Sequence, residues 1–358
     1  MTSPRSVLAP APKPRPTAVA SAAPLSLCSR GPCAALLNAR AKRVGKRTAL
    51  SFAQLLGEPN VYLTRSLEEA ERAVEAILAG GYRTLLVGGG DGTIAAALQL
   101  LDRAARRMKV YGLPELVVLR LGTGNALASM AGAGPPLEDA RRVLEGRLGD
   151  GARTLRVLES PGRDALFPFG SLGYDAQVLN DYVDVLSTTR SPLRQRLGRS
   201  LGGYLYAIAT RTIPTELRRG PSRVRVLTRG RASLVDQSTL EEIPLSAGSL
   251  LFEGEARAVL FGSTPFYGYG IKVLPYAQRR PDRFQVRVSA ASISYLISRL
   301  PALWSGRLRS SRLVDFLVED VRIEVERPLP LQLSGDAMGK VRSLDVRLAD
   351  RSFDLRTV

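Results

Sequence analysis

The segment over residues 84–93, TLLVGGGDGT, constrains the fold of this chain more than any other. Residues 84–87 are typical of a buried strand, and a helical pattern runs from 94 to about 107. Glycines between them let the backbone approach a phosphate closely. A helix that starts directly after such a loop favours an anion at its N-terminus. The segment therefore predicts a strand–loop–helix unit that holds phosphate groups.

The same alternation extends through residues 33–152. Strand-like runs at 33–37, 61–64 and 116–119 are separated by helical stretches, one of which begins at a capping box formed by Ser66 and Glu69. Strands that alternate with helices predict a doubly wound parallel sheet, an α/β domain.

Residues 153–358 have a different pattern. Short runs rich in strand-forming residues lie at 154–158, 223–227, 256–260, 283–288, 321–325 and 344–348. They predict a mostly antiparallel β domain, interrupted by helical stretches at about 191–213 and 293–304. Residues 1–32 are rich in proline and alanine, and we expect them to form a disordered tail.

Composition excludes several kinds of chemistry. The 358 residues include no histidine, so an imidazole base and a histidine-ligated zinc are excluded. Cys28 and Cys33 are the only cysteines, too few for a disulfide framework, and a cytoplasmic location is therefore expected. No run of about 18 apolar residues is present, so no membrane-spanning helix is expected. A formal charge of +18 suits an anionic membrane surface or nucleic acid.

Two loops together resemble those of a known family. GGGDGT over residues 88–93 resembles the nucleotide loop of the diacylglycerol kinase-like lipid kinases, a loop also similar in NAD kinases and phosphofructokinases. Residues 121–128, LGTGNALA, resemble the G-T-x-N-x-x-A segment of the lipid kinases and favour them over NAD kinase. Weaker likenesses lie at 38–42, at Thr64, at 170–176 and at 267–277, so the resemblance covers about residues 33–358.

The resemblance implies an ATP-binding α/β domain, a C-terminal β-sandwich and transfer of the γ-phosphoryl group of ATP to a lipid hydroxyl, of diacylglycerol or a related lipid, with Mg²⁺. Phosphoryl transfer needs positioning and charge neutralisation rather than histidine. Asp91 would have a catalytic role. The nucleotide-binding residues would be Asn38, Thr64, Gly88, Gly89, Gly90, Asp91, Gly92, Thr93, Gly122, Thr123 and Asn125.

The resemblance also suggests a metal site and a catalytic base. Asp282, with main-chain carbonyls of Arg279 and Phe284, lies where the family holds Mg²⁺, although a turn acid fits Asp282 as well. Asp336 is the candidate base, because Ser334-Gly335-Asp336 aligns with the family's Asp-Gly-Glu. Both usual carboxylates are changed there. A catalytically impaired lipid- or nucleotide-binding protein on the same fold is therefore the alternative.

Two basic stretches are candidate membrane contacts. Residues 190–231 hold eleven arginines and only Glu216 as an acid, with apolar residues at helical spacing between 197 and 208. Trp304, the only tryptophan, precedes three further arginines. Either stretch could meet an anionic lipid surface or simply pack its apolar side on the β domain. No stable nucleic-acid partner is expected, because stacking aromatics are not interleaved with the arginines. An oligomer is compatible with the sequence.

Overall fold

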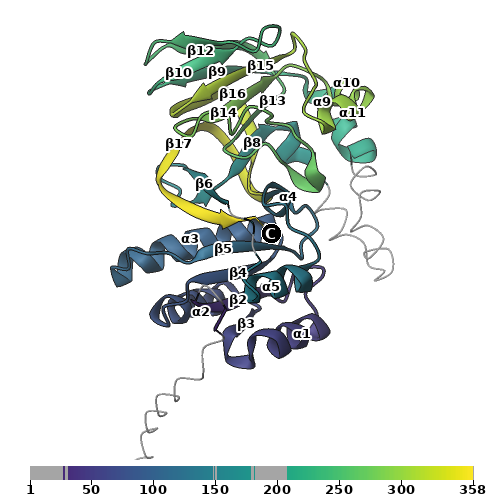
Figure 1. The fold of residues 1–358 in the computed structure, drawn as a ribbon. Coiled ribbons are helices and arrows are strands. Elements are labelled where there is room, and N and C mark those ends of the chain that lie inside the picture. Colours follow the sequence, from purple (N-terminus) through teal and green to yellow (C-terminus); the bar gives the residue numbers. More distant parts are fainter. Residues whose placement is uncertain are drawn as a thin grey trace, which may run out of the picture.

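The chain has an α/β region and a β-rich region, joined by a long strand (Figure 1). The structure, a computed structural model, describes residues 27–28, 31–147, 149, 151–178, 181 and 208–357. Most of the tail expected over 1–32 lies outside the described residues. Its described residues belong to strand β1 (Leu27–Cys28) and to the start of β2 (Gly31–Asn38), which pair with each other.

Parallel strands form the sheet of the α/β region, in the order β3–β2–β4–β5. Besides β2, these are β3 (Val61–Thr64), β4 (Thr84–Gly89) and β5 (Glu115–Arg120). The connecting segments are α1 (Lys46–Leu56), η1 (Glu58–Asn60), α2 (Leu67–Ala79), α3 (Asp91–Met108), α4 (Ala126–Met130) and α5 (Pro136–Leu144).

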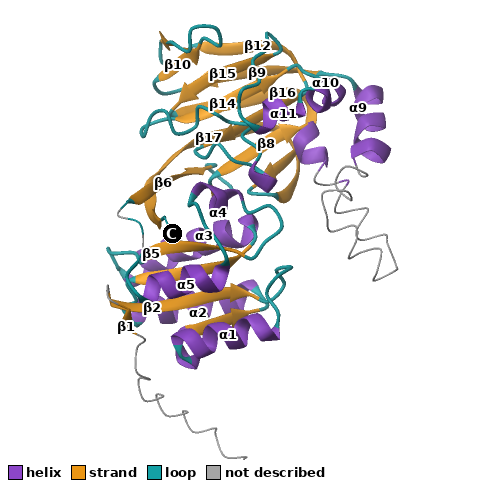
Figure 2. Ribbon diagram, turned by 45° about the vertical axis from the view of Figure 1, so that its right-hand side comes forward, coloured by secondary structure: helices purple, strands orange, loops and turns teal. Residues whose placement is uncertain are grey.

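Helices cover both faces of this sheet (Figure 2). Alternate residues of β2 point to opposite faces. Cys33 and Leu37 therefore pack with α1 and α5, while Ala34 and Leu36 pack with α2 and α3. This arrangement confirms the doubly wound α/β fold. The chain leaves β2 toward β3 on one side and returns to β4 on the other, so the carboxyl ends of β2 and β4 form a switch point where ligands commonly bind.

Antiparallel strands make up the second region. They are β6 (Ala152–Glu159), β7 (Leu166–Phe167), β8 (Phe169–Gly173), β9 (Ser222–Thr228), β10 (Ala232–Val235), β11 (Glu242–Leu245), β12 (Leu250–Ala256), β13 (Ala258–Gly262), β14 (Phe284–Ser289), β15 (Leu313–Val318), β16 (Asp320–Leu333) and β17 (Asp336–Arg356). Strand β16 pairs with β9 early and with β8 late, and side chains from both parts fill one apolar core. The expected β-rich C-terminal region is confirmed.

Helices of this region differ from the sequence-based expectation. One helix was expected over 293–304, but α10 (Ile293–Ser298) and α11 (Leu300–Trp304) are separate, because Pro301 has no N–H to continue the first. Of the helix expected over 191–213, residues 191–207 lie outside the described residues. The π-helix η2 (Ile208–Thr212) leads into α9 (Ile213–Arg219), and η3 (Gly268–Gly270) follows β13. The single strand expected over 256–260 is divided at Arg257 between β12 and β13.

Strand β17 returns the chain to the α/β region. It pairs with β16 at its start and with β6 further along, and its Leu355 lies beside Leu116 of β5 in parallel register. Phe353 and Leu355 are buried in the core between the sheet and α2 and α3. The division expected between residues 152 and 153 stays a prediction, but the two regions share this strand.

Candidate functional site

The first glycine-rich loop joins β4 to α3. The helix begins at Asp91, with Gly90 in extended conformation before it, so the first-turn N–H groups have no partner within the helix. Such groups attract an anion. Gly88 is the first glycine of this segment, and its expected binding role stays a prediction. It lies within β4, where an added Cβ would be 2.5 Å from a Leu37 methyl carbon and 2.7 Å from one of Leu121.

The second loop lies directly against the first. An added Cβ on Gly122 would be 2.3 Å from Gly90 Cα, so only glycine permits this approach of the two backbones. Asn125 closes the loop on itself. Its Oδ1 accepts from Gly122 N at 3.0 Å and its Nδ2 donates to Gly122 O at 3.1 Å. Asn125 adopts a left-handed conformation with φ of 53°, which asparagine tolerates.

Asn38 and Thr64 lie at the carboxyl ends of β2 and β3. Asn38 Nδ2 donates to Thr93 Oγ1 at 2.9 Å, which ties the end of β2 to the first turn of α3. Thr64 lines a second hollow of about 370 Å³, together with Tyr62, Glu69 and Arg72. The structure thus brings the residues expected around a nucleotide to one edge of the sheet. Their binding role stays a prediction.

Asp91 connects the two loops. Its Oδ1 accepts from Leu127 N at 3.1 Å, at the start of α4, and its Oδ2 lies next to Gly124. Burial raises the pKa of this carboxyl, and the backbone N–H groups of Ala126 and Leu127 oppose that rise. The geometry gives Asp91 a positioning role for α4. The catalytic role expected for it stays a prediction.

Asp336 lies beside the first loop, although 245 positions separate it from Asp91. It is the first residue of β17 and follows a turn in which Ser334 and Gly335 have φ of 54° and 88°. An added Cβ on Gly92 would be 2.7 Å from Asp336 Oδ2. Among the described residues this carboxylate has no hydrogen-bond partner, and partial removal of water raises its pKa. The carboxylate thus lies close to the glycine-rich loop, and its expected role as the base stays a prediction.

A pocket of about 450 Å³ starts at these loops and extends into the β-rich region. Gly92, Gly124 and Gly335 line its end at the loops. Its far wall comes from α10 and α11, through Ile293, Leu296, Ile297, Leu300, Leu303 and Trp304. Trp304, considered above as a membrane contact, thus faces a cavity. A mostly apolar cavity that reaches a glycine-rich loop suits a lipid.

Buried and half-buried polar side chains line part of this pocket, and sequence reasoning did not assign them to a site. Asp175 accepts from Ser171 Oγ at 2.6 Å, while Arg287 and Ser289 lie on β14. The available signal was the alternation in FQVRVS, which puts Arg287 and Ser289 on one face of a buried strand. Ser334 Oγ, next to Gly335, is also buried and has no hydrogen-bond partner among the residues that the structure describes.

The expected magnesium residues lie elsewhere. Asp282, Arg279 and Phe284 do not line the pocket. A guanidinium nitrogen of Arg231 lies 3.1 Å from Asp282 Oδ2, and Arg279 pairs with Glu242. A carboxylate already paired with a cation does not fit Mg²⁺. Across the described ranges, no group of three or more acidic or cysteine side chains could hold a metal ion.

The basic surfaces are only partly described, since Arg190, Arg194, Arg196 and Arg199 lie outside the described residues. On α9, Leu217 is 75% exposed and is followed by Arg218 and Arg219. The Arg312 guanidinium lies 4.7 Å from the centre of the Tyr295 ring. This arginine therefore contacts an aromatic side chain and does not face water alone. In the part of the chain that the structure describes, no helix is long and apolar enough to cross a bilayer.

Comparison with known proteins agrees with this geometry. Residues 34–156 match the diacylglycerol kinase catalytic domain. The "probable lipid kinase YegS-like" protein of Pseudomonas aeruginosa strain PAO1 is 44% identical over 72 residues, covering 20% of this chain and 21% of that protein. The "probable lipid kinase YegS" of Salmonella heidelberg is 24% identical over 255 residues, which cover 70% of this chain and 69% of that protein. The chain thus matches about a fifth to a quarter of the first relatives' lengths.

The fold is similar to that of a solved protein. The crystal structure of a diacylglycerol kinase from Bacillus anthracis str. Sterne superposes with a TM-score of 0.58 at 16% identity. The superposed residues cover 88% of this chain and 93% of the Bacillus anthracis protein. The similarity extends over both regions of the molecule.

Proposed function

We propose that the chain is a lipid kinase of the diacylglycerol kinase-like family and that it transfers the γ-phosphoryl group of ATP to a hydroxyl of a lipid such as diacylglycerol. One observation carries the proposal. The Asp336 carboxylate lies against Gly92, at the junction of the phosphate-type loops and the apolar pocket. An acceptor hydroxyl bound there would meet a base and a nucleotide phosphate together.

Each part of the site has a role in this reaction. The loop N–H groups and the start of α3 bind the phosphates, which spread negative charge in the transition state. Asn38 holds Thr93 in the first turn, and Thr64 lines the hollow on the nucleotide side. The apolar pocket receives the acyl chains.

The transfer step uses Asp336 as the base. Its carboxylate takes the proton of the acceptor hydroxyl, and the hydroxyl oxygen bonds to the γ-phosphorus. The bond from that phosphorus to the bridging oxygen of ADP breaks, and ADP leaves. The pKa of Asp336, raised above its ordinary value, brings the base closer to the working pH and makes it a better proton acceptor.

A second candidate follows from Ser334. The family's first carboxylate is replaced by this buried, unpartnered hydroxyl, and Asp336 is shorter than glutamate. A protein that binds a lipid or nucleotide without turnover on this fold is therefore the alternative. It predicts ATP binding with no phosphorylated lipid.

The acceptor would enter from an anionic membrane surface. Leu217 and the arginines of α9 lie in the same part of the β-rich region as α10 and α11 (Figure 1). An exposed apolar side chain flanked by cations suits such a surface. Peripheral membrane association of the chain is part of the proposal.

The test is transfer of labelled γ-phosphate from ATP with Mg²⁺ to diacylglycerol, monoacylglycerol, sphingosine or ceramide in anionic vesicles. Wild type is compared with Asp336→Asn and with Asp350→Asn. Asp350 is an exposed acid on the same strand and serves as the matched control. We expect labelled lipid with wild type and Asp350→Asn, and a loss of about 10²-fold or more with Asp336→Asn.

The other outcomes separate the candidates. ATP binding without any labelled lipid would favour the non-catalytic protein. Full transfer by Asp336→Asn would keep the kinase but contradict the assignment of the base.

A further inference from the structure

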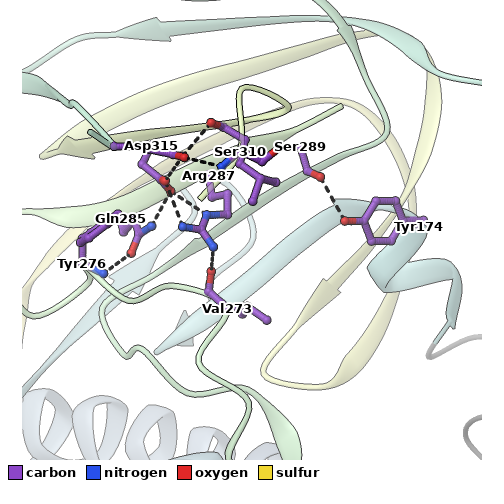
Figure 3. Close-up of polar contacts among 10 residues, drawn as sticks. Tyr174, Val273, Tyr276, Gln285, Arg287, Ser289, Ser310 and Asp315 are labelled. Carbon is purple, nitrogen blue, oxygen red and sulfur yellow. Dashed lines mark hydrogen bonds and ion pairs between the residues drawn. The ribbon is translucent and has the colours of Figure 1, made fainter. Parts of the chain in front are cut away.

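A largely buried polar cluster from β14 and the residue after β8 lies in the wall of the pocket, and the proposed transfer step does not use it. Tyr174, Arg287 and Ser289 line the pocket, and we call them the inner polar site (Figure 3). Arg287 is 3% exposed, and Asp315, which lies beside it on β15, is fully buried. The Tyr174 and Ser289 hydroxyls lie 3.2 Å apart. Such groups are costly to bury unless they have partners.

Hydrogen bonds within the protein leave part of Arg287 unused. Its Nε donates to Asp315 Oδ1 at 2.7 Å, one Nη donates to Asp315 Oδ2 at 2.9 Å, and the other donates to the Val273 carbonyl at 2.7 Å. A guanidinium has five N–H groups. Two of the five therefore have no acceptor among the described residues, on a side chain that lines the pocket.

The charge of this site is already balanced. Asp315 forms two bonds with Arg287 and also accepts from Gln237 at 2.8 Å and Gln285 at 2.6 Å. A second anion on Arg287 would lie close to the Asp315 carboxylate in a buried place, where like charges repel strongly. The free N–H groups therefore suit an uncharged oxygen acceptor.

The inner polar site is far from the end of the pocket at the loops. Gln332, Ser171, Leu260 and Arg287 lie opposite one another on successive strands. Three strand spacings of about 4.8 Å put Arg287 about 14 Å from Gln332 along the sheet. Gln332 itself accepts from Gly335 N at 2.8 Å, next to Asp336. Leu260 separates the polar groups at the two ends of this row.

We propose that the inner polar site binds an uncharged oxygen-containing group, such as a hydroxyl or carbonyl, carried along the apolar chain of the lipid. This rests on the proposed function, because it names the acceptor class of that pocket. The ester carbonyls of a plain glycerolipid are only a few bonds from its free hydroxyl and do not extend this far. The preferred lipid thus has an oxygenated acyl chain, in which the oxygen accepts from Arg287 and exchanges a hydrogen bond with Ser289 or Tyr174.

Trp304 provides the readout, since it is the only tryptophan and lines the pocket. The full chain, without nucleotide, is titrated with 1-(12-hydroxystearoyl)glycerol and with 1-stearoylglycerol, and tryptophan fluorescence gives the two dissociation constants. These probes differ by one hydroxyl. We expect the hydroxylated probe to bind about twofold to tenfold more tightly.

Two variants locate the preference. Ser289→Ala removes one hydroxyl, and Arg287→Lys keeps a cation beside Asp315 but removes the planar set of donors. Both are expected to bring the ratio of dissociation constants close to one. Ile297→Ala, on the apolar far wall, is the matched control and should weaken both probes alike. Thermal unfolding checks that each variant folds. If Arg287→Lys does not fold, the ratio of dissociation constants in Ser289→Ala alone decides the test.

Equal binding of the two probes by wild type would overturn the proposal, as would failure of both to bind. A wild-type ratio retained in both Ser289→Ala and Arg287→Lys would also overturn it. The proposed transfer reaction is judged separately. A preserved preference without phosphate transfer would contradict the kinase and leave the inner polar site standing.

Discussion

Gly92→Ala tests whether the contact between the glycine-rich loop and Asp336 matters for transfer. The new methyl carbon would be 2.7 Å from Asp336 Oδ2, whereas ordinary contacts begin at 3.4 Å. The carboxylate must therefore move away by about 0.7 Å. A displacement of about 1 Å in a reacting group can reduce the rate by about 10²-fold. We expect kcat for phosphate transfer to fall by tenfold to a hundredfold.

The fold should tolerate the same change. Gly92 lies in the first turn of α3 with a negative φ, where alanine is favourable. Replacement of glycine by alanine in a compatible helix position stabilises by about 0.5–1 kcal/mol. Activity should therefore fall while the free energy of unfolding stays equal or rises. Initial rates at saturating ATP and urea unfolding, measured on the same preparation, check both.

A double substitution identifies the path of the effect. If Gly92→Ala acts through Asp336, adding it to Asp336→Asn should cause little further loss. Independent, multiplicative losses would refute the reasoning, as would a Gly92→Ala enzyme with the wild-type rate. A change confined to the KM for ATP would indicate phosphate binding instead, and it too would contradict the role assigned to this contact.

Three further predictions follow from other contacts. In wild type, kcat/KM should rise with pH through the raised pKa of Asp336, since the base acts only when deprotonated; in Asp336→Asn a pH profile should lack this acidic limb. Asp91→Ala removes the acceptor of Leu127 N and should lower the free energy of unfolding by about 1–3 kcal/mol, so unchanged urea unfolding would contradict its positioning role. Asp282→Asn breaks an exposed ion pair with Arg231 and should cost less than about 1 kcal/mol; a changed Mg²⁺ concentration for half-maximal transfer would restore Asp282 as a metal ligand.

Local sequence patterns were enough for the class of the α/β region and for several of its elements, but not for α1 or for the division between α4 and α5. The runs that predict strands at 61–64 and 84–87 correspond to β3 and β4, and the Ser66 capping box begins α2 as expected, with Ser66 accepting from Glu69 N. Such signals depend on residues a few positions apart, so one sequence contains them. The fold of the C-terminal region was confirmed at the level of class and not of strand bounds.

The pocket could not be predicted from the sequence, because it is formed by contacts between residues far apart in the chain, which no local pattern specifies. Arg287 and Asp315 are 28 positions apart and meet only because β14 and β15 pair in one register. Asp282 illustrates the opposite case, in which a local pattern is present and the structure adds a contact that the pattern does not contain. The surrounding letters resemble a metal-binding segment, but Arg231, brought in from the end of the loop before β10, already pairs with the carboxylate.

Strand β17 makes the order of synthesis matter. Residues 31–144 emerge from the ribosome early, but their core still lacks Phe353 and Leu355 until the whole β-rich region has been made. At about 5–20 residues per second, the 211 positions between Leu144 and Leu355 keep that core incomplete for about 10–40 s. During that interval the partner edge of β5, including Leu116, is available to chaperones or to mispairing. The two regions should accordingly acquire full protease resistance together, once β17 has been made, rather than one after the other.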